Sequence, residues 1–198
     1  MFAIVLFAQT NNHIKFMGIP LTGTITQFQA KLVSKGCTYD KATSSSLSKG
    51  IKLYNGTFVG NKVKIFVYYD IKTKIVYRVK AVVNSLSEDI AEQKYSEIKD
   101  MLSQKYGSGP ENVYIGTKDG KEAASFVSTN VGGKINGTIG LYIVHYEVSL
   151  LTFPYDYSLH IDYYDRINSN EHDRNQLEEL WEKQSSMLYP QHLFIGRV

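Results

Sequence analysis

A long amphipathic segment in the middle of the chain separates two groups of strand-like runs. Its apolar side chains recur at steps of four and three residues and are Ala91, Tyr95, Ile98, Leu102 and Tyr106. This spacing predicts a helix, which Ser85 and Glu88 begin as a capping box and Gly107 ends. A helix with one apolar stripe must bury that stripe against another element. The segment therefore predicts a layered fold in which the helix packs on a sheet.

Two further amphipathic segments predict helices nearer the ends of the chain. Thr24 and Gln27 form a capping box for a helix over residues 25–35, and Gly36 is placed to end it. A third helix is predicted within residues 172–188, where apolar residues again fall on one face.

Eight runs rich in β-branched, aromatic and alternating apolar residues predict strands. They lie at residues 38–43, 51–59, 62–69, 74–83, 113–117, 122–129, 138–151 and 156–165, and a serine-rich loop is predicted at 43–48. A three-residue loop at 71–73 places Val67 opposite Tyr77 on one apolar face. In the last hairpin, a loop at 152–155 places Val144 opposite Tyr163.

The order of these elements is helix, strands, helix, strands, helix. It predicts an α+β fold, an antiparallel sheet with helices packed on one face. It also suggests two similar lobes, each a helix followed by strands. The first lobe spans residues 9–110, and the second, β-rich lobe with its C-terminal helix spans 111–198.

The first residues form an apolar run that ends in a small residue and then becomes polar. Phe2 to Phe7 resembles the apolar region of a secretory signal peptide, and Leu6–Phe7–Ala8 resembles its cleavage site. The run is shorter than the roughly 20 apolar residues that cross a bilayer. We therefore expect residues 1–8 to be a signal-peptide remnant and the protein to be periplasmic or secreted. The alternative reading is a buried N-terminal strand.

Composition narrows the choice of partners. The net charge of the chain is only +3, and its basic residues are spread along the sequence. Both features disfavour nucleic acid as a partner. After the first ten residues no stretch is apolar enough to span a membrane. Cys37 is the single cysteine, so no internal disulfide can form. A phosphate-binding loop needs Ser or Thr directly after its lysine, but here Ile135 follows Lys134. No cofactor is predicted.

The last hairpin gathers polar side chains on one predicted face. Its predicted register places His145 opposite Asp162 and Glu147 opposite His160. Imidazole and carboxylate groups are zinc ligands, and they also serve as acids and bases. An antiparallel hairpin equally needs a solvated polar face, and this interpretation is favoured here.

Tyrosine is unusually frequent, with 15 residues against nine Phe and one Trp. Its ring and hydroxyl suit both sheet packing and recognition surfaces. Tyr68 and Phe66 fall on the face opposite the apolar stripe from Val63 to Val67, which makes them candidate contact residues for a protein partner.

Several short motifs resemble those of a group of uncharacterised exported proteins of gut bacteria. The motifs are Phe16-x-Gly18-Ile19-Pro20-Leu21-Thr22-Gly23, Phe28 with Leu32 and Lys35-Gly36, Gly56-x-Phe58-x-Gly60, Lys105-Tyr106-Gly107 and, more loosely, Tyr163-x-Asp165-x-x-Asn168. The order of elements is also similar to that of beta-lactamase-inhibitor-protein-like folds. That similarity implies a concave sheet that binds a protein.

These observations favour a non-enzymatic, exported binding or interaction protein whose partner is another protein. Whether the chain is an enzyme stays open at this point. The alternative is a metal-dependent hydrolase that uses His145, Glu147, His160 and Asp162. A third reading is a structural protein of the cell envelope.

Overall fold

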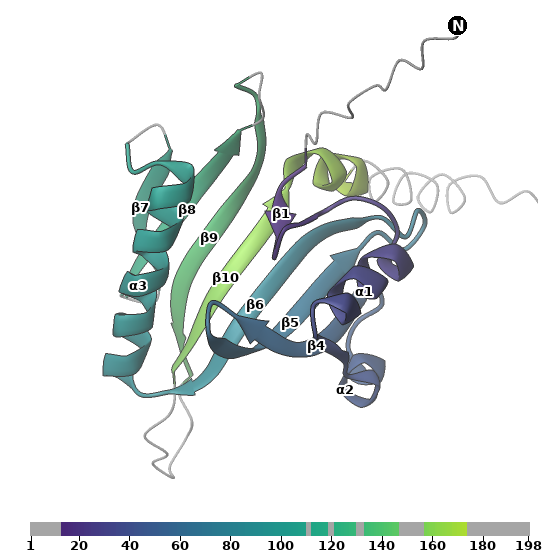
Figure 1. Cartoon of the computed structure of the whole chain (residues 1–198), viewed down its shortest axis with the longest axis horizontal. Helices are drawn as coiled ribbons and strands as arrows, with labels where there is room; N and C mark the ends of the chain where they lie inside the picture. Colours follow the sequence, from purple (N-terminus) through teal and green to yellow (C-terminus); the bar gives the residue numbers. More distant parts are fainter. Residues whose placement is uncertain (1–12, 110–111, 119–120, 130–132, 147–156, 174–198) are drawn as a thin grey trace, which may run out of the picture.

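The computed structural model describes residues 13–109, 112–118, 121–129, 133–146 and 157–173. These residues form one eight-stranded antiparallel sheet with helices packed against it (Figure 1). The α+β class, with an antiparallel sheet and helices on one face, is thereby confirmed.

The strands of the large sheet have the order β3-β4-β5-β6-β10-β9-β8-β7. Their bounds are Thr38–Tyr39 (β3), Ile51–Phe58 (β4), Asn61–Tyr69 (β5), Val76–Leu86 (β6), Val113–Lys118 (β7), Lys121–Thr129 (β8), Ile135–His145 (β9) and Tyr157–Asp165 (β10). Two short strands, β1 (Lys15–Phe16) and β2 (Ile19–Pro20), form a separate pair. The helices are α1 (Ile25–Ser34), α2 (Lys41–Ser46) and α3 (Glu88–Tyr106), and residues 166–173 are also helical.

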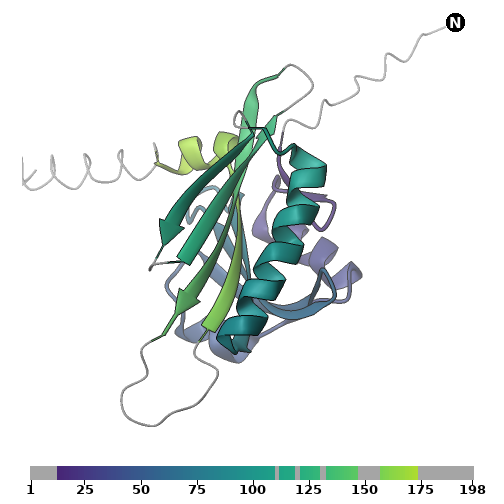
Figure 2. The ribbon, with the colours of Figure 1, turned by 90° about the vertical axis from the view of Figure 1, so that its left-hand side faces the viewer.

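The sheet is continuous across the two halves of the chain. Strands β3 to β6 lie in chain order, whereas β7 to β10 lie in reverse order, so β6 and β10 are neighbours at the centre. The two predicted lobes therefore contribute to a single sheet. Figure 2 shows α3 lying lengthwise along one face of the strands from the second half.

The core lies between this face and the helices. Helix α1 buries Ile25, Phe28 and Leu32, and α3 buries most of its predicted stripe. These side chains join the odd-numbered apolar residues of β5 and β6 in one cluster. Burial of this apolar surface is the main stabilising contribution. Among the described residues, no helix is long and apolar enough to cross a membrane.

A capping box begins α1, whereas the one predicted for α3 is not formed. The capping box of α1 is confirmed, because the Gln27 amide donates to the Thr24 hydroxyl and the Thr24 amide donates to the Gln27 side chain. The capping box predicted from Ser85 and Glu88 is wrong. Strand β6 continues to Leu86, and Ser87 is the N-cap of α3. The Glu88 carboxylate instead accepts a hydrogen bond from Lys121 of β8.

The strand and serine-rich loop predicted over 38–48 are largely replaced by helix α2. Asp40 ends the short β3 and caps α2, because its carboxylate accepts from the Thr43 amide at 3.0 Å and the Thr43 hydroxyl at 2.9 Å. The hydroxyl of Ser44 then accepts from the Leu53 amide at 2.8 Å, which fixes α2 against β4. Side-chain bonds from Asp40 therefore outweigh the weak strand preference.

The predicted register of β5 and β6 is wrong by two residues beyond a bulge in β6, although the buried face there, with Val79 and Ala81, is correct. Val67 pairs with Val79 and not with Tyr77. One residue of the shift arises at the loop, because Tyr69 pairs with Val76 and not with Ile75. The second arises because Tyr77 bulges out of the ladder between the partners of Tyr68 and Tyr69. A shift of two residues preserves the face that each side chain occupies.

The end of β10 anchors the N-terminal segment of the described chain. Asp165 is fully buried, and its carboxylate accepts from the Ile14 amide at 3.1 Å and the Asn168 amide at 2.9 Å. His13 Nδ1 lies 3.1 Å from the same carboxylate. The predicted helix over 172–188 lies outside the described residues from position 174 onward.

Candidate functional site

The face of the sheet opposite α1 and α3 is called the open face here. Direct partners across antiparallel strands point to the same side of a sheet. In the observed register the open face is formed at its centre by Lys64, Phe66 and Tyr68 of β5, Arg78, Lys80, Val82 and Asn84 of β6, Ser158, His160 and Asp162 of β10, and Tyr142 of β9.

Phe66 and Tyr68 lie on this face, as their alternation with the buried Val63, Ile65 and Val67 predicts. Both rings are half-buried. They line a small pocket of about 160 Å³, whose other walls are Lys80, Val82, Asn84, Tyr146 and His160. Small-molecule sites usually enclose roughly 300–1,000 Å³, so this pocket suits a single side chain better than a cofactor.

Arg78 and Asp162 form an ion pair with two N–O contacts on the open face. Arg78 Nε lies 2.8 Å from Asp162 Oδ1, and Nη2 lies 2.5 Å from Oδ2. The guanidinium also lies over the Tyr68 ring, 4.8 Å from its centroid. The hydrogen bond to Asp162 raises the pKa of Arg78 further above its ordinary value. Both carboxylate oxygens of Asp162 are therefore bound by Arg78, and this ion pair joins β6 to β10.

His160 and Ser158 form a close pair beside the pocket. Ser158 Oγ lies 2.8 Å from His160 Nε2 and 3.4 Å from the Tyr146 hydroxyl. Burial lowers the pKa of His160 to about 4, and the cations Lys80 and Lys118 add to this shift. His160 Nδ1 is buried and has no hydrogen-bond partner among the described residues.

This pair lacks the features of an activated nucleophile. A nucleophilic serine needs an accessible hydroxyl and a histidine that a third group orients and keeps basic. Ser158 is only 1% exposed, and the low pKa makes His160 a weak base at neutral pH. The nearby carboxylate of Asp162 is held by Arg78. The arrangement is better suited to holding a polar group than to attacking one.

The predicted pairing of His145 with Asp162 is wrong. In the observed register His145 pairs with Tyr157, His160 pairs with Tyr142 and Asp162 pairs with Gly140. The predicted register differs from this one by five residues, and an odd shift moves side chains to the opposite face.

His145 and His160 therefore lie on opposite faces of the sheet. His145 is exposed and stacks on the Tyr157 ring with centroids 4.6 Å apart. Glu147 lies outside the described residues. In the part of the chain that the structure describes, no three His, Cys, Asp or Glu side chains gather as a metal site.

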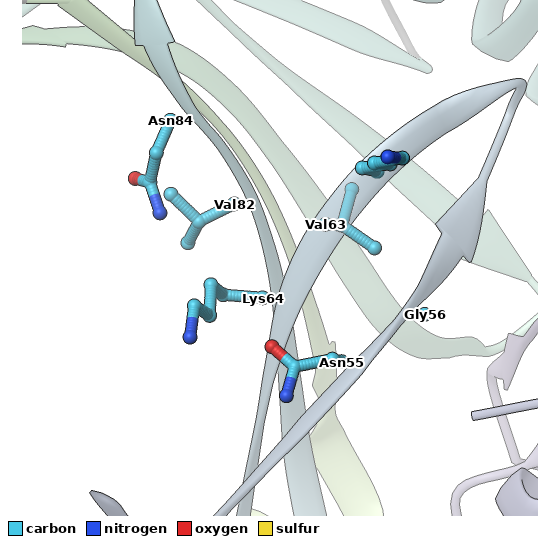
Figure 3. A pocket seen from close by; sticks show the side chains of 7 residues that line it. Asn55, Gly56, Val63, Lys64, Val82 and Asn84 are labelled. Atoms are coloured by element: carbon cyan, nitrogen blue, oxygen red, sulfur yellow. The ribbon is translucent and has the colours of Figure 1, made fainter. Parts of the chain in front are cut away.

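A second hollow of about 330 Å³ continues from the pocket along the open face. Its lining includes Asn55, Lys62 and Lys64. Figure 3 shows the side chains of Lys64, Val82 and Asn84 projecting to the same side, whereas Val63 points the other way. Because Val82 and Asn84 line both hollows, the two form one shallow groove that runs over β4, β5 and β6 to His160 of β10.

Sequence reasoning missed the basic residues of this groove. Arg78 and Lys80 alternate with Val79 and Ala81 along β6. That alternation places them on the same face as Phe66 and Tyr68 in the predicted register and in the observed one, because the two registers differ by two residues. The signal was present in the sequence, but the prediction of contact residues drew only on aromatic side chains.

Comparisons of the chain with protein families, with curated proteins and with solved structures gave no match.

Proposed function

We propose that this chain is an exported, non-enzymatic binding protein that meets a protein partner on the open face of its sheet. The observation that carries the proposal is the groove lined by Phe66, Tyr68 and charged side chains on the face opposite the helices. Tyrosine and arginine are enriched where protein interfaces gain most of their binding energy. Here Tyr68 and Arg78 lie against each other at the edge of the pocket.

The rigid setting of these side chains also supports a binding role. Phe66 and Tyr68 belong to an interior strand, which pairs with β4 on one side and β6 on the other. Side chains fixed by a sheet lose little conformational freedom when a partner docks. Export is proposed from the apolar run at residues 1–8 alone.

The experiment is site-specific cross-linking in the native host, followed by reconstitution. A photo-reactive amino acid replaces Phe66 on the open face, and in a control it replaces Lys31 on the exposed surface of α1. A partner is expected to be captured from position 66 and not from position 31. Absence of any adduct specific to position 66 would reject the proposal.

Reconstitution with the purified partner tests the residues. Phe66→Ala and Tyr68→Ala are each expected to weaken binding by about tenfold or more, which corresponds to about 1.4 kcal/mol. Tyr39→Ala is the matched control, because this exposed tyrosine lies on the edge strand β3 and packs against Tyr54, a residue of the helix-covered core. Equal weakening by the control would also contradict the proposal.

A further inference from the structure

The pocket beside Phe66 and Tyr68 is lined by groups that can donate hydrogen bonds or carry positive charge. They are the Lys80 ammonium, the Asn84 amide, the Tyr146 hydroxyl and the His160 ring. The pocket has apolar walls on one side, from Phe66 and Val82. A carboxylate on a short aliphatic stem matches both features.

His160 gives the pocket an unsatisfied polar atom. The residue is 8% exposed, and its Nδ1 has no partner among the described residues. An unpaired buried polar atom costs about 1–3 kcal/mol, so a ligand that supplies a partner would gain this energy. The other ring nitrogen is already bound to Ser158, so Nδ1 is the ring nitrogen that is left without a partner among the described residues.

Lys80 is a half-buried cation that is poorly paired. Its ammonium lies 3.9 Å from Asp162 Oδ2, whereas good charge-assisted bonds are about 2.7–2.9 Å long. The same oxygen already accepts from Arg78 at 2.5 Å. Burial lowers the pKa of Lys80, with Arg78 and Lys118 acting in the same direction. An incoming carboxylate would give this cation a close counter-ion.

The whole groove carries an excess of positive charge. Five cationic side chains lie on or beside it, namely Lys62, Lys64, Arg78, Lys80 and Lys118. Two described carboxylates face them, because Asp40 lies 3.6 Å from Lys64 and Asp162 binds Arg78. The excess is three charges, on a chain whose overall net charge is +3. Such a field favours association with an acidic surface.

We infer that the groove receives an acidic segment of the protein partner, one carboxylate of which enters the pocket between Lys80 and His160. This inference rests on the proposed function and names the chemistry of its partner. The carboxylate accepts hydrogen bonds from the Lys80 ammonium and from His160 Nδ1–H, while neighbouring acidic residues face Lys62 and Lys64.

The arrangement of the aromatic rings favours a polypeptide over nucleic acid. Single-stranded nucleic acid binds by stacking bases on exposed ring faces. The Arg78 guanidinium covers the Tyr68 ring, and the Lys118 ammonium lies 3.9 Å from the centroid of the Tyr142 ring.

The test uses a fluorescein-labelled decaglutamate peptide as the probe and the full chain as the receptor. Lys80→Gln is expected to weaken binding at least fivefold, and Tyr146→Phe, which removes one hydroxyl from the pocket lining, about threefold. Lys31→Gln removes the same charge from the surface of α1 and is expected to leave the affinity unchanged. Circular dichroism establishes that each variant is folded.

Histidine ring resonances in nuclear magnetic resonance spectra give a second readout. Addition of decaglutamate is expected to shift the His160 signals and to leave those of His145, on the other face, in place. An unchanged affinity in Lys80→Gln, or an unshifted His160 ring, overturns the inference. Tighter binding of a ten-nucleotide thymidine strand than of decaglutamate overturns it in favour of nucleic acid.

The two proposals fail in different ways. If cross-linking at position 66 captures a partner but decaglutamate neither binds nor competes with it, the binding face stands and its acidic specificity is wrong. If position 66 captures no partner, the proposed function falls whatever decaglutamate does.

Discussion

The guanidinium of Arg78 binds both carboxylate oxygens of Asp162 and so connects the two halves of the sheet at its centre. Asp162 lies on β10 and Arg78 on β6, and these strands are separated in the chain by α3 and three further strands. The pair also fixes the Tyr68 ring, over which the guanidinium lies. The pair therefore supports one wall of the pocket, the Tyr68 ring, as well as the contact between the halves.

Asp162→Asn is expected to lower the free energy of unfolding by about 2 kcal/mol. The substitution leaves the Arg78 cation partly buried without its counter-ion. Removing one partner of such a pair costs more free energy than the pair contributes to stability. Urea denaturation measures the change. Glu122→Gln is the control, since Glu122 pairs with Lys99 on a more exposed surface and should cost less than about 1 kcal/mol. Equal losses in the two variants would contradict this account.

Features that depend on neighbouring residues were predicted well. The capping box of α1, the stripe of α3 and the extents of most strands follow from local spacing and are observed. Helix α2 was missed because its start depends on one capping residue, Asp40, in a stretch with little apolar periodicity. Local propensity alone does not reveal such a helix.

Features that depend on strand register were predicted less well. The β9–β10 prediction placed the even-numbered apolar residues 144–150 opposite Tyr157 to Tyr163 of β10, whereas the core residues opposite this strand are Ile139, Leu141 and Ile143, nearer the start of β9. Both alignments satisfy alternation, and only packing against α3 distinguishes them. The predicted cluster of His145 with Asp162 depended on the predicted register, and it is absent because that register is wrong.

The pH dependence of His13 tests the anchor at the end of β10. The hydrogen bond to Asp165 raises the folded-state pKa of His13 above 6.5, so the protonated ring stabilises the fold. This contribution is fully present below pH 6.5 and is lost as the pH rises through the folded-state value. Relative to His13→Gln, the wild type should be more stable at pH 5.5 by about 1 kcal/mol or less, and this advantage should shrink by pH 9. A constant difference across this range would refute the prediction.

Three glycines in strands allow a graded test of close packing. A Cβ on Gly137 would lie 2.6 Å from the backbone oxygen of Tyr164, and one on Gly56 would lie 2.8 Å from Cys37 Sγ. A Cβ on Gly116 meets nothing within 4 Å. Gly137→Ala should therefore destabilise most, Gly56→Ala by about 1–3 kcal/mol, and Gly116→Ala should be neutral or slightly stabilising. Thermal unfolding would show the order.

Adding Cys37→Ala to Gly56→Ala should recover part of the loss, because the clashing sulfur is removed. The two substitutions should then be non-additive, as expected for residues in contact. Strict additivity would show that the contact between Cys37 and Gly56 does not limit the packing of β4.

His160 should make the fold sensitive to mild acid. Burial lowers its folded-state pKa from 6.5 to about 4, so the folded state holds the neutral ring while the unfolded chain takes up a proton. The stabilisation is present above pH 6.5 and is lost as the pH falls toward 4, a change on the order of 2 kcal/mol. His160→Gln, which does not titrate, should lose less stability over this interval when both proteins are unfolded by urea. The His160 ring should titrate near pH 4 in nuclear magnetic resonance spectra, whereas His13 titrates above 6.5. A His160 midpoint near 6.5 would mean that water reaches the ring freely, and the pocket beside Lys80 would then lack the buried polar atom on which its specificity depends.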